Sequence, residues 1–327
     1  MLRDELKKLP NESYIDYMVR LFENKSSYNL NCEEIADILN FYNGHSYGES
    51  AYRKYWKAFN EGRQYERGYT GRNPHARILS ISDLHIPFQK PVAVFGKYAC
   101  KVDILQINGD ILDCAAISKF SKTYRTSVVQ EIIEARQYLI DLIDFIKPTE
   151  IVVTYGNHDI RLENYLAKNL DSDIIELMPR TPLDFILFDG ITHYDKQSRA
   201  TMKYDPLAKV FPSVKITYDD NWWCQIGQTV FCHPLAFSSM PMKTAEKALL
   251  FFRNEGVQFT SLVMAHTHRV GMYKIGSTEL FEQGACCDTS KMHYHNGQLV
   301  NSQKEGYIYL EQDENGMVTY YDQVILN

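Results

Sequence analysis

From Arg77 onward, short apolar runs alternate with helical segments, and five of the runs end in a polar cluster. The clusters are Asp83-x-His85, Gly109-Asp110-x-x-Asp113, Gly156-Asn157-His158-Asp159, the single His233, and His266-Thr267-His268. Strands that alternate with helices predict a layered α/β fold, with the strands inside and the helices outside. Loops at the ends of such strands converge on one crevice. Because folding needs no charged residue at these positions, the pattern predicts a functional site.

The residue types in these clusters are those that bind hard or borderline metal ions. They offer carboxylate oxygens, imidazole nitrogens and an amide oxygen. Motifs such as D-x-H and H-x-H are common, so each cluster alone is weak support for a site. Five clusters at five strand ends are strong support, because burying so many polar groups together is costly unless positive charge lies among them.

The order D-x-H, G-D-x-x-D, G-N-H-D, H and H-T-H resembles the calcineurin-like metallophosphoesterase superfamily, over about residues 77–312. The resemblance implies a two-sheet αββα sandwich that holds two metal ions. It also implies seven metal ligands, namely Asp83, His85 and His268 for one ion, Asn157, His233 and His266 for the other, and Asp110 as a bridge.

In the same resemblance, His158 lies beside the metals without binding them, and Asp113 orients its ring. Two adjacent cations lower the pKa of a bridging water, and the resulting hydroxide attacks phosphorus. A carboxylate partner such as Asp113 favours a protonated His158, which donates to the leaving oxygen. Ligands of Asp, Asn and His without Cys suit Mn, Fe or Zn, and we expect Mn.

Two positions depart from the family pattern. Ala265 stands before the last H-x-H pair, where Gly is usual. Cys114 follows Asp113, where the Ser/Thr phosphoprotein phosphatases have Arg, which weakens a protein-phosphatase interpretation. The segment between Asn157 and His233 is long, and we expect an insertion at about 165–230 that shapes substrate access.

Residues 1–76 lack the short apolar runs that alternate with helical segments in the rest of the chain. We expect a helical module with a linker here, followed by the phosphoesterase domain at 77–327. Periodic apolar residues predict a first helix after Ser13 and a second that Asn31 caps and Asn43-Gly44 ends. A third helix is expected at about 50–62. Two short helices with a Gly-bearing turn have the outline of a helix-turn-helix.

Several basic residues bear on the substrate. The candidates for nucleic-acid contact are Arg53, Lys54 and Lys57 of the third helix, Lys122 and Arg125 of the loop after Asp113, and Arg161. We therefore expect a two-metal phosphodiesterase that acts as a nuclease, with DNA as the partner. The alternative is a phosphatase or phosphodiesterase for a small nucleotide or a phosphoprotein, with the N-terminal helices as a homodimer or partner surface. A third hypothesis is a DNA-binding regulator with a vestigial catalytic domain.

Net charge, cysteine content and apolar runs limit these hypotheses. The net charge of −6 argues against wholesale coating of nucleic acid but not against a local basic surface. The seven Cys include no CxxC pair, which favours a reducing cytoplasm over a disulfide framework. No uncharged apolar run is long enough to predict a membrane span.

Overall fold

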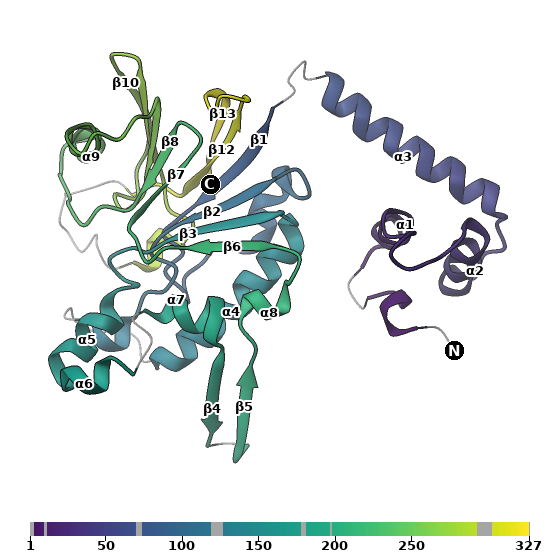
Figure 1. The fold of residues 1–327 in the computed structure, drawn as a ribbon, viewed down its shortest axis with the longest axis horizontal. Helices are drawn as coiled ribbons and strands as arrows, with labels where there is room; N and C mark the ends of the chain where they lie inside the picture. Colours follow the sequence, from purple (N-terminus) through teal and green to yellow (C-terminus); the bar gives the residue numbers. More distant parts are fainter. Residues whose placement is uncertain are drawn as a thin grey trace. The chain divides into compact units, whose positions relative to one another are not determined.

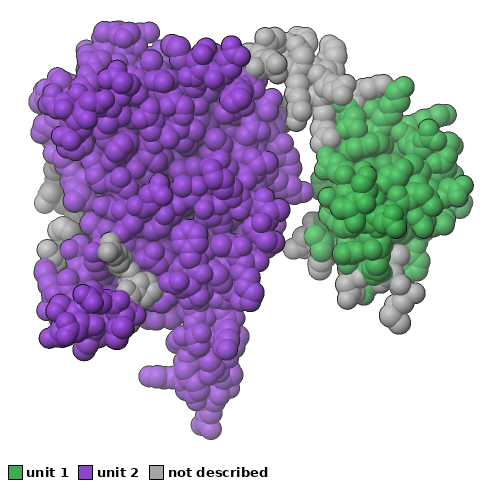
Figure 2. Space-filling model, viewed as in Figure 1, with its two compact units in different colours: residues 1–73 green, residues 74–327 purple. Residues whose placement is uncertain are grey.

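The computed structural model describes residues 3–9, 12–69, 74–118, 127–177, 181–196, 198–292 and 303–326. The chain divides into two compact units, Met1–Asn73 and Pro74–Asn327 (Figure 2). Each unit has its own buried core.

The first unit is a small helical domain, as the sequence predicts. A short 3-10 turn, η1 (Asp4–Leu6), precedes α1 (Tyr14–Glu23), α2 (Cys32–Asn43) and α3 (Glu49–Tyr69). The Asn31 side chain accepts a hydrogen bond from Glu34 N at 2.9 Å, and Glu34 returns one from Asn31 N at 2.7 Å. This capping box begins α2, and Gly44, with φ of 64°, ends it. The helix expected at 50–62 continues to Tyr69.

The core of the first unit comes from one face of each helix. Tyr17, Leu21, Ile35, Leu39 and Tyr52 are buried together. Their three- and four-residue spacing within each helix explains why the apolar pattern in the sequence was informative here.

The second unit contains two mixed sheets (Figure 1). The first has the strand order β13-β12-β1-β2-β3-β6, and the second has the order β10-β11-β9-β8-β7. The strands of the first sheet are β1 (Ala76–Ile81), β2 (Ile104–Asn108), β3 (Glu150–Thr154), β6 (Lys215–Tyr218), β12 (Gly306–Gln312) and β13 (Val318–Ile325). Those of the second are β7 (Trp223–Ile226), β8 (Thr229–Cys232), β9 (Ser261–Met264), β10 (Val270–Ile275) and β11 (Thr278–Gln283).

The two sheets pack face to face between two helices, which confirms the expected sandwich. Their inner faces contribute one apolar cluster: Ile78, Ile308 and Leu310 from the first sheet, and Phe231, Val263 and Phe281 from the second. Helix α4 (Val128–Ile146) packs on the outer face of the first sheet, and α9 (Lys243–Asn254) on that of the second. Successive residues of β1 are buried on opposite faces of the first sheet. Ile78 packs between the two sheets, and Leu79 packs in the apolar cluster under α4.

Short elements connect the strands. They are η2 (Val92–Tyr98), η3 (Ala115–Ile117), α5 (Arg161–Asn169), α6 (Ser172–Ile175), α7 (Pro182–Asp184), η4 (Phe185–Asp189), β4 (Ile191–Asp195), β5 (Ala200–Tyr204), α8 (Leu207–Val210) and η5 (Thr289–Lys291).

The insertion between β3 and the second sheet is shorter than the sequence predicts. Residues 215–218 form β6, which pairs in parallel with β3 in the first sheet, and residues 223–232 form the β7–β8 hairpin of the second. The expected span of 165–230 therefore includes strands of the sandwich itself. Its elements outside the sandwich lie before residue 211, and β4 and β5 form a separate two-stranded sheet among them.

Candidate metal centre

The predicted ligands lie on loops that follow the carboxyl ends of five strands. Asp83 follows β1, Asp110 follows β2, Asn157 follows β3, His233 follows β8, and His266 follows β9. Because β1, β2 and β3 run in parallel, and β8 runs parallel to β9, each sheet brings its loops to one edge. The sandwich then brings the two edges together.

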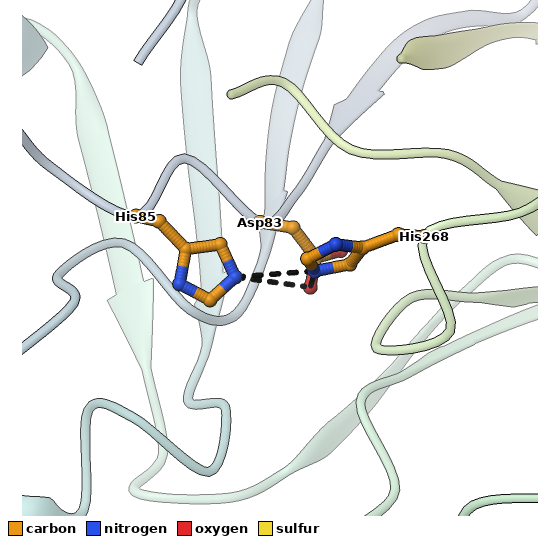
Figure 3. Close-up of side chains that lie close together, drawn as sticks. All are labelled: Asp83, His85 and His268. Carbon is orange, nitrogen blue, oxygen red and sulfur yellow. Dashed lines mark hydrogen bonds and ion pairs between the residues drawn. The ribbon is translucent and has the colours of Figure 1, made fainter. Parts of the chain in front are cut away.

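One group of potential ligands is Asp83, His85 and His268 (Figure 3). His268 Nε2 lies 3.1 Å from Asp83 Oδ1 and 3.1 Å from His85 Nε2. All three side chains are at least 95% buried. Two ring nitrogens and a carboxylate oxygen that converge in this way can bind one divalent cation.

The second group is Asp110, His233 and His266. His233 Nδ1 donates to the carbonyl oxygen of Asn108 at 2.7 Å, which turns Nε2 toward Asp110 Oδ2 at 3.3 Å. The neighbouring Asn157 Oδ1 is buried and accepts no hydrogen bond from the described residues. A buried acceptor without a donor is costly, and a bound cation would satisfy it. This group therefore also fits a metal ion.

Asp110 joins the two groups. Its Oδ2 lies 3.3 Å from His233 Nε2 and 3.7 Å from His85 Nε2, one ring from each group. Its Oδ1 accepts a hydrogen bond from His158 N at 2.7 Å, which fixes the carboxylate. The position suits the bridging role that the sequence assigns to Asp110.

His158 and Asp113 are in contact, as the sequence predicts. His158 Nδ1 lies 3.1 Å from Asp113 Oδ1 and 3.0 Å from the Asp113 carbonyl oxygen. His158 Nε2 faces Asp110 Oδ2 at 3.9 Å. The ring thus lies at the edge of the centre, with one nitrogen held by Asp113 and the other directed toward the potential ligands.

Arg161 lies beside this pair. Its Nη1 donates to the Asp113 carbonyl oxygen at 2.7 Å, and its Nη2 lies 2.9 Å from His158 Nε2. A guanidinium only donates, so in this arrangement Nε2 accepts and the ring hydrogen is on Nδ1. The contact places a hydrogen-bond donor against the ring nitrogen that the sequence argument expects to donate.

The backbone around the centre is strained. Left-handed φ angles are uncommon for residues other than Gly. Five of the seven predicted ligands have them: Asp83 at 51°, His85 at 44°, Asp110 at 53°, His266 at 78° and His268 at 50°. Strain of this kind persists only where the surrounding structure enforces it, and it is concentrated at functional sites.

The charges of the centre compensate one another. Burial disfavours the charged form of Asp83. The attraction of the nearby His268 and His233 is stronger than this effect of burial, and it lowers the pKa of the Asp83 carboxyl to about 2. Burial likewise disfavours a charged His233, yet Asp110 outweighs it and raises the pKa of this ring to about 10. Burial lowers the pKa of His266 to about 4. Protons on histidine thus balance the carboxylates here, and bound cations would replace those protons.

Asp159 has a role that the sequence argument did not assign. It is fully buried, and its Oδ1 accepts from Ile111 N at 3.1 Å and Leu112 N at 3.2 Å, while Oδ2 accepts from Gly156 N at 2.8 Å. These bonds tie the loop of Asp110 to the loop of Asn157. A Cβ on Gly156 would lie 2.2 Å from Asp110 Oδ1, so only glycine permits this approach.

The residues proposed for nucleic-acid contact are divided between the two units of the chain. Arg53, Lys54 and Lys57 are exposed on α3 in the first unit, and Arg53 pairs with Glu49 at 3.3 Å. Lys122 and Arg125 lie outside the described residues. Arg161 contacts His158 and Asp113, as described above.

Comparison with known proteins decides the family. Residues 76–270 match the calcineurin-like phosphoesterase family, and residues 2–69 match the YonJ N-terminal domain. The chain belongs to the calcineurin-like phosphoesterase family. This membership supports a metal-dependent phosphoester hydrolase, in agreement with the clustered Asp and His residues.

One relative of this chain is the SPbeta prophage-derived uncharacterized protein YonJ of Bacillus subtilis (strain 168). The two are 43% identical over 63 residues, which are 19% of this chain and 16% of YonJ. The match thus spans about a sixth of that protein's length.

Several solved structures are similar to this chain at low sequence identity. Wild-type Vps29 from Entamoeba histolytica, solved with Zn²⁺, is 13% identical, covers 77% of this chain and 99% of its own, and has a TM-score of 0.36. An archaeal phosphodiesterase is 15% identical, with 76% and 99% covered and a TM-score of 0.33. YfcE, a phosphoesterase from E. coli, is 12% identical, with 76% and 99% covered and a TM-score of 0.33.

None of the described helices combines the length and the apolar character that a bilayer span needs.

The seven cysteines are free thiols, and Cys114, Cys232, Cys286 and Cys287 are buried.

Proposed function

We propose that this chain is a two-metal phosphodiesterase that cleaves nucleic acid, with DNA as the preferred substrate. The observation that carries the hydrolytic part is the pair of ligand groups that Asp110 connects, with His158 and Asp113 beside them, where these two form a third possible group with His85. We assign Asp83, His85 and His268 to one ion and Asn157, His233 and His266 to the other. A donor set of Asp, Asn and His favours Mn, with Fe or Zn as the other candidates.

Bound divalent cations supply Lewis acidity, which activates water at neutral pH and neutralises phosphoryl charge. The chain's own residues do the rest. The strained loops and Asp159 hold the ligands in place before any ion arrives, so little reorganisation is needed on binding.

His158 is assigned to proton transfer to the leaving oxygen. Asp113 holds its Nδ1, so Nε2 is the nitrogen that faces the reacting group. Donation requires a proton on Nε2, so Arg161 must release this nitrogen, which then takes up a proton from solvent. A phosphoryl group in the site offers Arg161 oxygen acceptors in exchange, and guanidinium groups bind phosphate with two parallel hydrogen bonds. We infer that substrate entry itself frees His158 for catalysis.

The choice of nucleic acid has separate support. Arg53, Lys54 and Lys57 are exposed on one helix of the first unit, and Arg53 also pairs with Glu49. Basic side chains on a protein surface commonly contact phosphates. A catalytic domain linked to a DNA-reading module would act on a substrate held nearby at high effective concentration. Free thiols are compatible with action in a reducing cytoplasm.

The test is a parallel assay of the full chain with Mn²⁺. The substrates are bis(p-nitrophenyl) phosphate, p-nitrophenyl phosphate, and single- and double-stranded DNA, with the Asp110→Asn variant as the inactive control. We expect hydrolysis of the diester and of DNA. Activity on the monoester alone would replace the proposal by a phosphatase, and activity on the diester without DNA would point to a small nucleotide.

A further inference from the structure

The hairpin of β4 and β5 stands apart from the sandwich. It is a two-stranded sheet of its own, and it projects from the second unit as an arm (Figures 1 and 2). We call residues 191–204 the β-arm. An isolated hairpin gains little stability in water, so a protein that keeps one on its surface gains something else from it.

The base of the β-arm is fixed to the body of the unit. Ile191 is 8% exposed and belongs to the main apolar core under α4. Arg136 of α4 donates from Nε to the Asp205 carbonyl oxygen at 2.5 Å, and its guanidinium lies 5.8 Å from the centre of the Tyr204 ring. The arm therefore has a rigid root, and its direction is set by the fold.

The exposed charged residues of the β-arm are basic. Lys196 and Arg199 lie in the turn at its far end, and Lys203 lies near the root, opposite Thr192. None of the three forms an ion pair with the described residues. The acidic residue Asp195 is engaged locally, since its Oδ2 accepts from Ser198 N at 3.0 Å within the turn. The whole chain carries a net charge of −6, so this excess of positive charge runs against the rest of the molecule.

One face of the β-arm offers groups suited to a polar polymer. Lys203 pairs with Thr192, and Thr201 pairs with Tyr194, so these four side chains share a face. Tyr194 is 55% exposed. A lysine, two hydroxyls and an exposed aromatic ring on a narrow ribbon can contact phosphates and base edges together.

We propose that the β-arm is a contact surface for duplex nucleic acid. The major groove of B-DNA is wide enough for a two-stranded β-ribbon, and basic side chains at its tip would meet the flanking phosphates. This proposal rests on the proposed function in one respect only, which is that nucleic acid is the substrate. Binding of a duplex by the β-arm does not itself require hydrolysis. It also gives the insertion between β3 and β6 a role in substrate capture.

The test compares the full chain with two triple variants. The arm variant carries Lys196→Ala, Arg199→Ala and Lys203→Ala. The matched control removes three exposed lysines elsewhere in the second unit, Lys101, Lys247 and Lys274, also by substitution with Ala. Affinity for a 20-base-pair duplex and for the corresponding single strand is measured without added metal, at several salt concentrations.

We expect the arm variant to lose about tenfold or more in duplex affinity at low salt, and the control to lose much less. The slope of log K against log salt should become shallower by about 0.9 for each phosphate contact removed. Hydrolysis of bis(p-nitrophenyl) phosphate should match that of the wild type, which shows that the arm variant is folded.

Each other outcome is decisive. Wild-type duplex affinity and slope in the arm variant would overturn the proposal, as would a loss confined to the single strand or an equal loss in the control. If the wild type hydrolyses no phosphodiester yet duplex binding depends on the arm, the proposed function fails and the β-arm proposal stands.

Discussion

The two units of this chain treat buried polar groups in opposite ways. In the described part of the helical unit, every buried residue is apolar or a tyrosine, and Ser13 and Asn31 cap the first ends of α1 and α2. In the phosphoesterase unit, Asp83, Asp110 and His233 are fully or almost fully buried, and ligand residues occupy left-handed backbone conformations. The first unit thus has an ordinary apolar core, and its charged groups lie on its surface. In the second unit, strained backbone and buried charged side chains form the candidate metal centre.

This contrast predicts that substitutions in the centre change activity far more than those in the helical unit. The largest effect is expected for Asp110→Asn. The amide has one neutral oxygen where a charged carboxylate joins both ligand groups, so both ions should bind weakly. We expect hydrolysis of bis(p-nitrophenyl) phosphate to fall by about 10³-fold or more, with metal content reduced at both sites. Full metal content and activity would refute the bridging role.

His158→Ala should come next. His158 contacts Asp113 and is not among the assigned ligands, so metal content should remain close to that of the wild type while kcat falls by about 10²–10⁴-fold. Elemental analysis and steady-state kinetics on one preparation separate the two effects. His75→Ala, at an exposed position outside the centre and the β-arm, is the matched control and should leave kcat unchanged. A variant that lacks metal would show that His158 is a ligand instead.

A stability effect that depends on pH should follow from Glu131. This residue of α4 is fully buried, and burial, together with the charge of Asp113, raises the pKa of its carboxyl to about 7 from its ordinary value of 4.5. The folded state therefore favours the protonated form, and stability is lost as the pH rises from about 4.5 through 7. Relative to the wild type, Glu131→Gln should unfold at the same urea concentration at low pH but be up to about 3 kcal/mol more stable at pH 8.

Urea unfolding of the phosphoesterase unit at several pH values measures this difference. The exposed Glu163→Gln is the control, and its stability relative to the wild type should not change with pH. A constant difference for Glu131→Gln across the range would mean that Glu131 stays charged when folded.

The smallest effect is expected in the helical unit. Asn31→Ala removes one half of the capping box of α2 and should destabilise this unit by about 1 kcal/mol. Hydrogen exchange of residues 32–43 reports the change directly. Hydrolysis of bis(p-nitrophenyl) phosphate should be unaffected, and a large loss of that activity would break the contrast between the units.

The sequence predicts which Asp and His side chains cluster, because the signal for them is local. Asp83, Asp110 and His233 each follow an apolar run within two residues, so the end of the strand and the ligand are visible together. The capped helix α2 was predictable for the same reason, since Asn31 and Gly44 mark its ends.

The rest depends on contacts between segments that are distant in sequence. Asp159 acts through backbone groups of Ile111 and Leu112, and nothing in its own motif indicates which loop it ties. Strand β6 is a four-residue edge strand of mixed polarity, so its pairing with β3 gives no clear periodic signal. The basic residues of the β-arm are separated in sequence by neutral ones, and only the pairing of β4 with β5 places them on one ribbon.

The account depends most directly on the metal content of the protein. Purified full-length chain, incubated with Mn²⁺ and dialysed, should contain close to two ions per chain by elemental analysis, and anomalous scattering should place one beside His268 and one beside His266. A centre that stays empty under these conditions would contradict the account.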